Sequence, residues 1–209
     1  LSSSSAASDV YKRQDETYLH IERDAEGNIL KEETRDYISI ATTRPETMLG
    51  DGAIAVNPKD QRYAAIIGKY CEIPVGPKEH RRLIPIILDE YPDPEFGSGA
   101  VKITGAHDFN DYQVAKRNNV PLYRLMDTKG RMRADGLPYS DAALLAEKFS
   151  TGKDFTEAEI DTLNLVPEEF RGLDRFEARK LIVDHITNQG LAVKTIEENQ
   201  NGQKQEEIP

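Results

Sequence analysis

GSGAVKITGAHDFND, residues Gly97–Asp111, is the stretch that decides how this chain folds. Its first half is rich in β-branched residues and predicts a strand over 99–104. The segment HDFNDYQVAKRNN predicts a helix over 107–119. The chain therefore passes from a strand almost directly into a helix, and the polar residues at this junction are expected to lie close together.

Side chains alternate between the two faces of a strand, which divides the predicted strand into two pairs. Val101 and Ile103 point one way and are expected in the core. Lys102 and Thr104 point the other way, towards solvent or a cleft.

Two carboxylates follow this strand. Asp108 and Asp111 stand three residues apart at the predicted helix start, so they share one side of it. Together with Lys102 and Thr104 they would suit a small zwitterion or an amino acid that carries a hydroxyl group. The spacing equally fits a structural reading, with Asp108 as an N-cap and Asp111 as a favourable charge at the positive helix end. A lone His107 favours a structural role over that of a base.

The rest of the chain is predicted to alternate short strands with helices. Apolar, proline-bounded runs predict strands over 37–43, 52–58, 71–75 and 82–88, a hairpin around 122–130, and a strand over 191–196. Helices are predicted over 60–70, 140–149, 155–165 and 174–190, with N-caps at Asp60, Thr156 and Asp174. Short, irregularly spaced strands favour a mainly β, α+β fold: a closed β-barrel-like domain with peripheral helices.

Composition excludes several classes of protein. The 209 residues include 38% apolar residues, enough for one sizeable core, and carry a net charge of -10, which does not suit a stand-alone nucleic-acid binder. The single cysteine, Cys71, excludes a disulfide framework and a thiolate metal site within one chain and fits a reducing cytosol. No apolar run is long enough to cross a bilayer. GxSxG, HExxH and CxxC motifs are absent, and GSGAV lacks the lysine of a P-loop.

Two long motifs resemble one family. ATTRPETMLGD (Ala41–Asp51) and GSGAVKITGAHDFNDYQVAKRN (Gly97–Asn118) resemble the signatures of the editing (CP1) domain inserted in the valyl-, isoleucyl- and leucyl-tRNA synthetases. RPET and VKIT follow the valyl pattern, and the similarity extends from Tyr37 to Leu191. Gly105 departs from it, since valyl enzymes usually have proline there, and it is expected to loosen the turn. HIGH- and KMSKS-type signatures for ATP activation are absent.

The resemblance implies a role for each matching residue. Residues expected to line the pocket for the amino acid are Phe96, Lys102, Thr104, Asp108 and Asp111. Those expected to hold the tRNA end are Thr42, Thr43, Arg44, Glu46 and Thr47. Asp111 would pair with the substrate ammonium, Asp108 and Lys102 would read its hydroxyl, and Phe96 would pack on the terminal adenosine or the pocket wall. Catalysis is expected to depend on Asp111, Thr43 and Lys102, with no metal and no cofactor in this domain.

The implied activity is hydrolysis of mischarged threonyl-tRNA(Val), an aminoacyl-tRNA deacylase within valine–tRNA ligase. Its partners would be the tRNA(Val) acceptor end, a threonine moiety and the rest of a cytoplasmic, monomeric synthetase; ATP would serve only the parent enzyme. Two alternatives stay open: a module that binds the acceptor end without turnover, and a free-standing deacylase that acts in trans.

The two ends of the chain are polar and are expected to lie outside the domain. Residues 1–14 predict a disordered tail or a cloning scar, 15–196 the editing domain, and 197–209 a polar tail or linker. An insert excised from a larger enzyme would show such ends.

Overall fold

The chain consists of short strands and short helices. The computed structural model describes residues 4–12 and 17–198. The strands are β1 (Ser4–Lys12), β2 (Tyr18–Arg23), β3 (Ile29–Arg35), β4 (Tyr37–Thr42), β5 (Ala53–Val56), β6 (Tyr70–Glu72), β7 (Leu83–Leu88), β8 (Ala100–Ile103) and β9 (Ala192–Glu198). The α-helices are α1 (Phe109–Arg117), α2 (Tyr139–Ser150), α3 (Glu157–Thr162) and α4 (Arg175–Asn188). The 3-10 helices are η1 (Pro45–Gly50), η2 (Gln61–Ile66), η3 (Lys78–His80) and η4 (Glu168–Phe170).

The main sheet has the strand order β4-β1-β6-β7-β5-β8, and β9 pairs with β1. β5 lies between β7, to which it runs parallel, and β8, to which it runs antiparallel, so all four of its apolar side chains are buried. The end strands β4 and β8 contact each other, but no hydrogen-bonded ladder joins them within 4–12 and 17–198. The mixed α/β fold is therefore an open sheet, and the predicted closed barrel is not confirmed.

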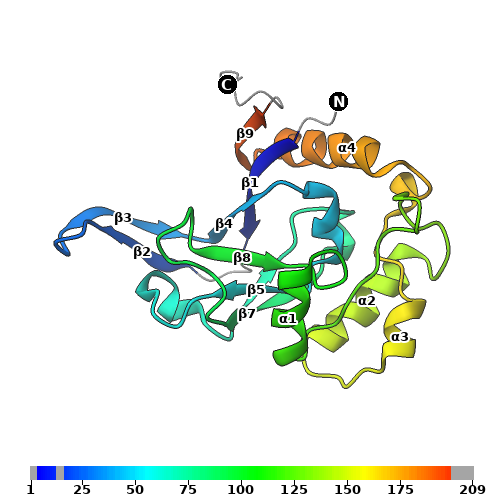
Figure 1. The fold of residues 1–209 in the computed structure, drawn as a ribbon, viewed down its shortest axis with the longest axis horizontal. Coiled ribbons are helices and arrows are strands. Elements are labelled where there is room, and N and C mark those ends of the chain that lie inside the picture. The colour runs from blue at the N-terminus through cyan, green and yellow to red at the C-terminus, as the bar shows by residue number, and fades with distance from the viewer. Residues whose placement is uncertain (1–3, 13–16, 199–209) are drawn as a thin grey trace.

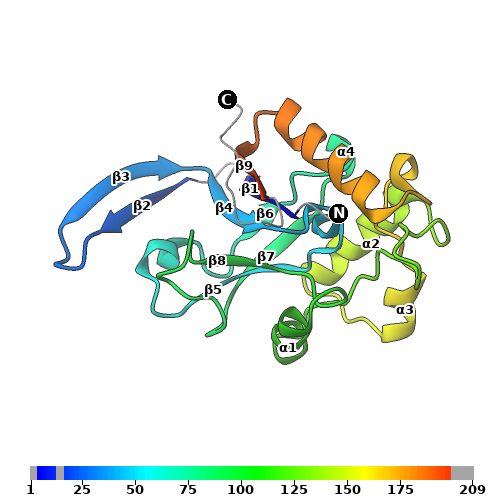
Figure 2. The same ribbon diagram turned by 45° about the horizontal axis from the view of Figure 1, so that its top comes forward.

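The helices gather away from the β2–β3 hairpin, which projects from the sheet as an arm (Figures 1 and 2). α1 comes next after β8, α2 and α3 lie beyond it, and α4 packs against η1 and ends beside β9 (Figures 1 and 2). The predicted caps at Thr156 and Asp174 are confirmed, the first as a capping box. The segment predicted as a helix over 60–70 forms only the 3-10 helix η2, although Asp60 caps it as predicted. No helix in the described part of the chain is long and apolar enough to span a membrane.

The prediction of a disordered tail is wrong for most of residues 1–14. Ser4–Lys12 form β1, which pairs antiparallel with both β4 and β9. Backbone donors and acceptors make this ladder, so its formation does not require a strongly apolar sequence. The predicted strand over 191–196 is confirmed as β9; residues 199–209 of the predicted tail lie outside the described residues.

A small apolar cluster fixes α1 against the end of the sheet. It contains Ala53 and Ala55 of β5, Ile103 of β8, and Val114 and Ala115 of α1. The turn between β8 and α1 is correspondingly tight. A Cβ at Gly105 would lie 2.5 Å from Leu122 Cδ2 and 2.8 Å from Ala115 Cβ. Gly105 is therefore a close-packed position rather than the loosened turn that the sequence suggested.

Candidate functional site

A cavity of about 270 Å³ lies where β4, β8 and α1 meet. β4 and β8 are the two end strands of the main sheet. It is lined by Ala41, Thr42, Thr43, Arg44, Thr47, Tyr91, Val101, Lys102, Thr104, His107, Asp108 and Asp111. The volume is close to the lower end for small-molecule pockets. Eight of the ten sequence-predicted site residues thus share one cavity.

Lys102 is buried in this wall and makes three hydrogen bonds. Its ammonium donates to Thr47 Oγ1 at 2.8 Å, to Asp51 Oδ1 at 3.0 Å and to Thr104 Oγ1 at 2.5 Å. The Thr104 hydroxyl in turn donates to Asp51. Strand alternation puts Lys102 and Thr104 on one face, as predicted, but that face is nearly closed to solvent: they are 8% and 1% exposed.

Asp111 lies in the first turn of α1 and is 7% exposed. Its Oδ2 accepts the main-chain N–H of Thr104 at 2.9 Å. Burial raises the pKa of Asp111 to about 6, although the Thr104 N–H and the charge of Lys102 act to lower it. No hydrogen-bond partner for Oδ1 is found among the described residues. The carboxylate is therefore held by one oxygen while it lines the cavity.

Asp108 and His107 have structural contacts as well as a place at the cavity. Asp108 caps α1, since its Oδ1 accepts from the N–H groups of Asn110 at 2.8 Å and Asp111 at 3.2 Å. His107 Nε2 accepts the N–H of Leu125 at 2.9 Å, which places the proton of a neutral imidazole on Nδ1. Burial, with the charges of Arg44 and Lys102, lowers the pKa of His107 to about 4. Both structural readings from the sequence are confirmed, and neither removes these groups from the cavity.

The turn after β4 presents Arg44 at the cavity rim. Thr42 Oγ1 accepts the Arg44 N–H at 3.1 Å, and Thr47 Oγ1 donates to the Arg44 carbonyl at 2.9 Å. The guanidinium donates to the carbonyl of His107 at 2.6 Å and remains 38% exposed. Thr43 is exposed beside it. This turn therefore presents the Arg44 guanidinium, fixed by a hydrogen bond, and the exposed hydroxyl of Thr43.

Two predicted site residues do not line the cavity. Glu46 is fully buried and accepts a bidentate pair of hydrogen bonds from Arg179 of α4, both at 2.7 Å. Phe96 is 81% exposed in the loop before β8. Glu46 is held at the contact between η1 and α4, where Arg179 supplies the charged partner that a buried carboxylate needs, and its Oε1 also lies 3.8 Å from Arg44 Nε.

The structure adds two residues that the sequence analysis missed. Asp51 is fully buried behind Lys102, and Tyr91, 40% exposed, forms part of the cavity wall. Asp51 ends the first motif, and its acidic character in an apolar turn was an available signal. Tyr91 lies in a loop, and nothing in the local pattern points to it.

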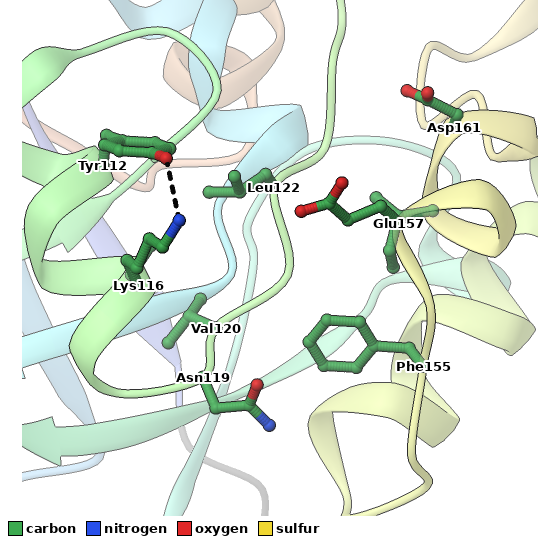
Figure 3. A pocket seen from close by; sticks show the side chains of 10 residues that line it. Tyr112, Lys116, Asn119, Val120, Leu122, Phe155, Glu157 and Asp161 are labelled. Atoms are coloured by element: carbon green, nitrogen blue, oxygen red, sulfur yellow. Dashed lines mark hydrogen bonds between the residues drawn. The ribbon is translucent and has the colours of Figure 1, made fainter.

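A second cavity of about 400 Å³ lies between α1 and α3 (Figure 3). Lys116 donates to the Tyr112 hydroxyl at 3.3 Å and lies over its ring, whereas Glu157 and Asp161 stand across the gap (Figure 3). None of the predicted site residues is among those that line it. Within the described ranges, no group of three or more His, Cys, Asp or Glu side chains could hold a metal ion.

Comparison with known proteins identifies the family. The chain is 71% identical over 180 residues to a valine–tRNA ligase of Ruegeria pomeroyi and 40% identical over 192 residues to one of Xanthomonas euvesicatoria. Each match covers 86% of this chain and 18% of the relative, so the chain spans less than a fifth of their length. No protein-family profile matches the chain.

The fold matches a solved synthetase domain. The crystal structure of GlLeuRS-CP1 aligns with a TM-score of 0.53 at 13% identity and covers 93% of this chain and 100% of the other. At that identity the match concerns the fold. Taken with the sequence matches, it confirms the resemblance seen in the two motifs: the chain corresponds to the CP1 editing-domain segment of the valine–tRNA ligases.

Proposed function

We propose that this segment hydrolyses threonyl-tRNA(Val) as the proofreading domain of a valine–tRNA ligase. The observation that carries the proposal is the state of Asp111. Asp111 lines a small polar cavity as a largely buried carboxylate, with one oxygen held by Thr104 and no hydrogen bond to the other from residues 4–12 and 17–198. A buried carboxylate is costly without a partner, and the α-ammonium of an aminoacyl ester would supply one.

The cavity also suits selection of threonine over valine. An apolar pocket rejects an isostere with an added hydroxyl only weakly, so a second site must act on the hydroxyl itself. Asp108, exposed at the start of α1, uses Oδ1 as the helix cap, which leaves Oδ2 as an acceptor for the threonine hydroxyl. Valine would leave such polar groups unpaired, at a cost of about 1–3 kcal/mol per group.

The reaction itself is attack of water on the ester carbonyl carbon. A bond forms from the water oxygen to this carbon, the bond to the ribose oxygen breaks, and a proton passes to that oxygen. Positioned water and electrostatic stabilisation of the tetrahedral oxyanion are sufficient modes for such chemistry. Arg44 and Thr43 at the rim are the proposed groups for the ribose, its phosphate and the water. The vicinal ribose hydroxyl is a further proton acceptor within the substrate.

The net charge of -10 places the main RNA contacts outside this segment. The cavity would receive the acceptor end while the body of the synthetase binds the rest of the tRNA. Deacylation should therefore be measured in the full-length synthetase, with threonyl-tRNA(Val) and valyl-tRNA(Val) as paired substrates. Faster hydrolysis of the threonyl ester is expected.

Equal rates for the two esters would contradict the proposal. RNA binding without turnover would instead support the acceptor-end module. A second measurement with the isolated 209-residue chain distinguishes the trans-acting deacylase, because only that alternative requires full activity without the body of the enzyme.

A further inference from the structure

Asp51 is a fully buried acid next to the cavity. It follows η1 directly, its side chain is fully buried, and it is not among the residues that line the cavity. Its Oδ1 accepts from the Lys102 ammonium at 3.0 Å and from the Thr104 hydroxyl. Asp51 therefore lies behind the cavity wall and holds two of its members.

The bonds of Lys102 limit what that residue can do. An ammonium has three hydrogens, and all three point to acceptors inside the protein, on Thr47, Asp51 and Thr104. A direct bond from Lys102 to a substrate hydroxyl would have to replace one of them. Its charge reaches the cavity, whereas its donors are already engaged.

Thr104 links this cluster to Asp111. Its hydroxyl is shared between Lys102 and Asp51, while its main-chain N–H donates to Asp111 Oδ2 at 2.9 Å. The contacts of the hydroxyl hold Thr104 in place, and a displacement of the whole residue, side chain and main chain together, would move the donor that orients Asp111. A purely stabilising role would not explain why the Lys102–Asp51 ion pair is buried here, because replacing a buried ion pair by apolar residues is often neutral for stability.

We propose that Asp51 is a positioning residue for the hydrolytic site: through Lys102 and Thr104 it orients Asp111 towards the substrate ammonium. This inference rests on the proposed function. It changes the part expected of Lys102, which becomes a member of the supporting cluster and acts on substrate through its charge and through Thr104.

The test uses Asp51→Asn in the full-length synthetase with threonyl-tRNA(Val). Asparagine keeps the shape and one acceptor oxygen but loses the charge, so kcat/KM for deacylation should fall roughly tenfold, the equivalent of one charged hydrogen bond. Asp60→Asn is the matched control. Asp60 is also a buried acid, paired with Arg62 at 2.7 Å, but its side-chain bonds go to Arg62, which does not line the cavity, whereas those of Asp51 go to the lining residues Lys102 and Thr104. An equal loss in both variants would overturn the proposal.

The pH dependence of kcat/KM in Asp51→Asn supplies a second measurement, which a loss of stability alone would not change. The charged or titratable groups that surround Asp111 are Lys102, Asp51, Asp108 and Tyr91. The charge of Asp51 raises the pKa of Asp111, and that of Lys102 lowers it. Removing the charge of Asp51 should therefore lower the pKa of Asp111 and move the acid limb of kcat/KM to lower pH. An unmoved limb would count against the proposal.

A double-mutant cycle covers the case in which Asp51→Asn does not fold. Lys102→Met combined with Asp51→Asn removes both buried charges, which avoids an uncompensated ion. If Asp51 acts largely through Lys102, with its bond to Thr104 as the remaining route, the double variant should deacylate well within tenfold of the rate of Lys102→Met alone. A further tenfold loss in the double variant would overturn the proposal. Wild-type enzyme that fails to deacylate would instead overturn the proposed function itself.

Discussion

Two cavities beside helix α1 differ in how their polar groups are held. In the first, Asp111 faces a cavity whose wall contains a buried ion pair and several charge-assisted hydrogen bonds. In the second, Lys116 bonds to the Tyr112 hydroxyl and lies over its ring, and Glu157 and Asp161 are exposed across the gap (Figure 3).

The difference shows why size is a poor guide to function. The cavity beside α3 has the larger volume, about 400 Å³ against about 270 Å³. Its charged groups are solvated, so they adjust to water at little cost. Groups fixed in a buried cluster are oriented before a ligand arrives, which is what selective binding and catalysis require. The smaller cavity is therefore the functional candidate.

The largest expected effect comes from Asp111. Asp111→Ala should lower kcat/KM for threonyl-tRNA(Val) deacylation roughly 10- to 100-fold, since it removes a charged contact worth about 1.5–3 kcal/mol. Single-turnover deacylation by the full-length enzyme measures this. Asp161→Ala, which removes an acid from the second cavity, is the control and should leave the rate unchanged. A similar loss in both variants would contradict the contrast between the cavities.

The kcat/KM for deacylation is expected to rise roughly tenfold between pH 5 and pH 7. The pKa of Asp111 is raised to about 6, and only its ionised form pairs with an ammonium, so kcat/KM should rise with pH through this range. His107, with a pKa of about 4, stays neutral and adds nothing. Asp111→Asn should abolish the limb, and its persistence in that variant would refute the assignment.

The same shift has a consequence for stability, with the opposite sign. A raised carboxyl pKa favours the protonated native state, so its stabilising contribution is complete below the ordinary value of 3.8 and is lost as pH rises through about 6. Asp111→Asn should flatten the fall in the free energy of unfolding across this window. Denaturant titrations at several pH values measure the slope.

Arg179→Lys tests how much the buried contact between Arg179 of α4 and Glu46 of η1 contributes to stability. Lysine keeps the charge but loses the two-pronged contact with Glu46, so the free energy of unfolding should fall by about 1–1.5 kcal/mol. Thermal unfolding of the isolated chain measures the change. Arg175→Lys is the matched control, because Arg175 is exposed and lies over the Phe176 ring. Equal destabilisation by both would show that the buried pair has no special role.

The smallest effect is expected at Lys116. Lys116→Met removes an exposed charge from the second cavity and should change the free energy of unfolding by no more than about 0.5 kcal/mol. Deacylation should stay at the wild-type rate. A marked loss of hydrolysis would mean that the cavity between α1 and α3 takes part in function.

Local patterns anticipated much of this structure. Alternation placed Lys102 and Thr104 on one face, spacing made Asp108 a cap, and a capping box began α3 at Thr156. The predicted closed barrel is not confirmed. Whether β4 and β8 pair depends on strands far apart in sequence, which no local pattern reports. β1 was missed because its pairing uses backbone groups that carry no side-chain signal.

The sequence by itself determined the two motifs, the family and the group of polar residues around the β8–α1 junction, because short-range spacing and side-chain chemistry are written in the chain. The tertiary structure alone decided which of those groups face the cavity. It buried Glu46 against Arg179, left Phe96 in solvent, and put Asp51 behind Lys102. The burial and pairing of Glu46 and Asp51 arise from contacts between segments that are far apart in the chain, and burial in the folded chain raises the pKa of Asp111.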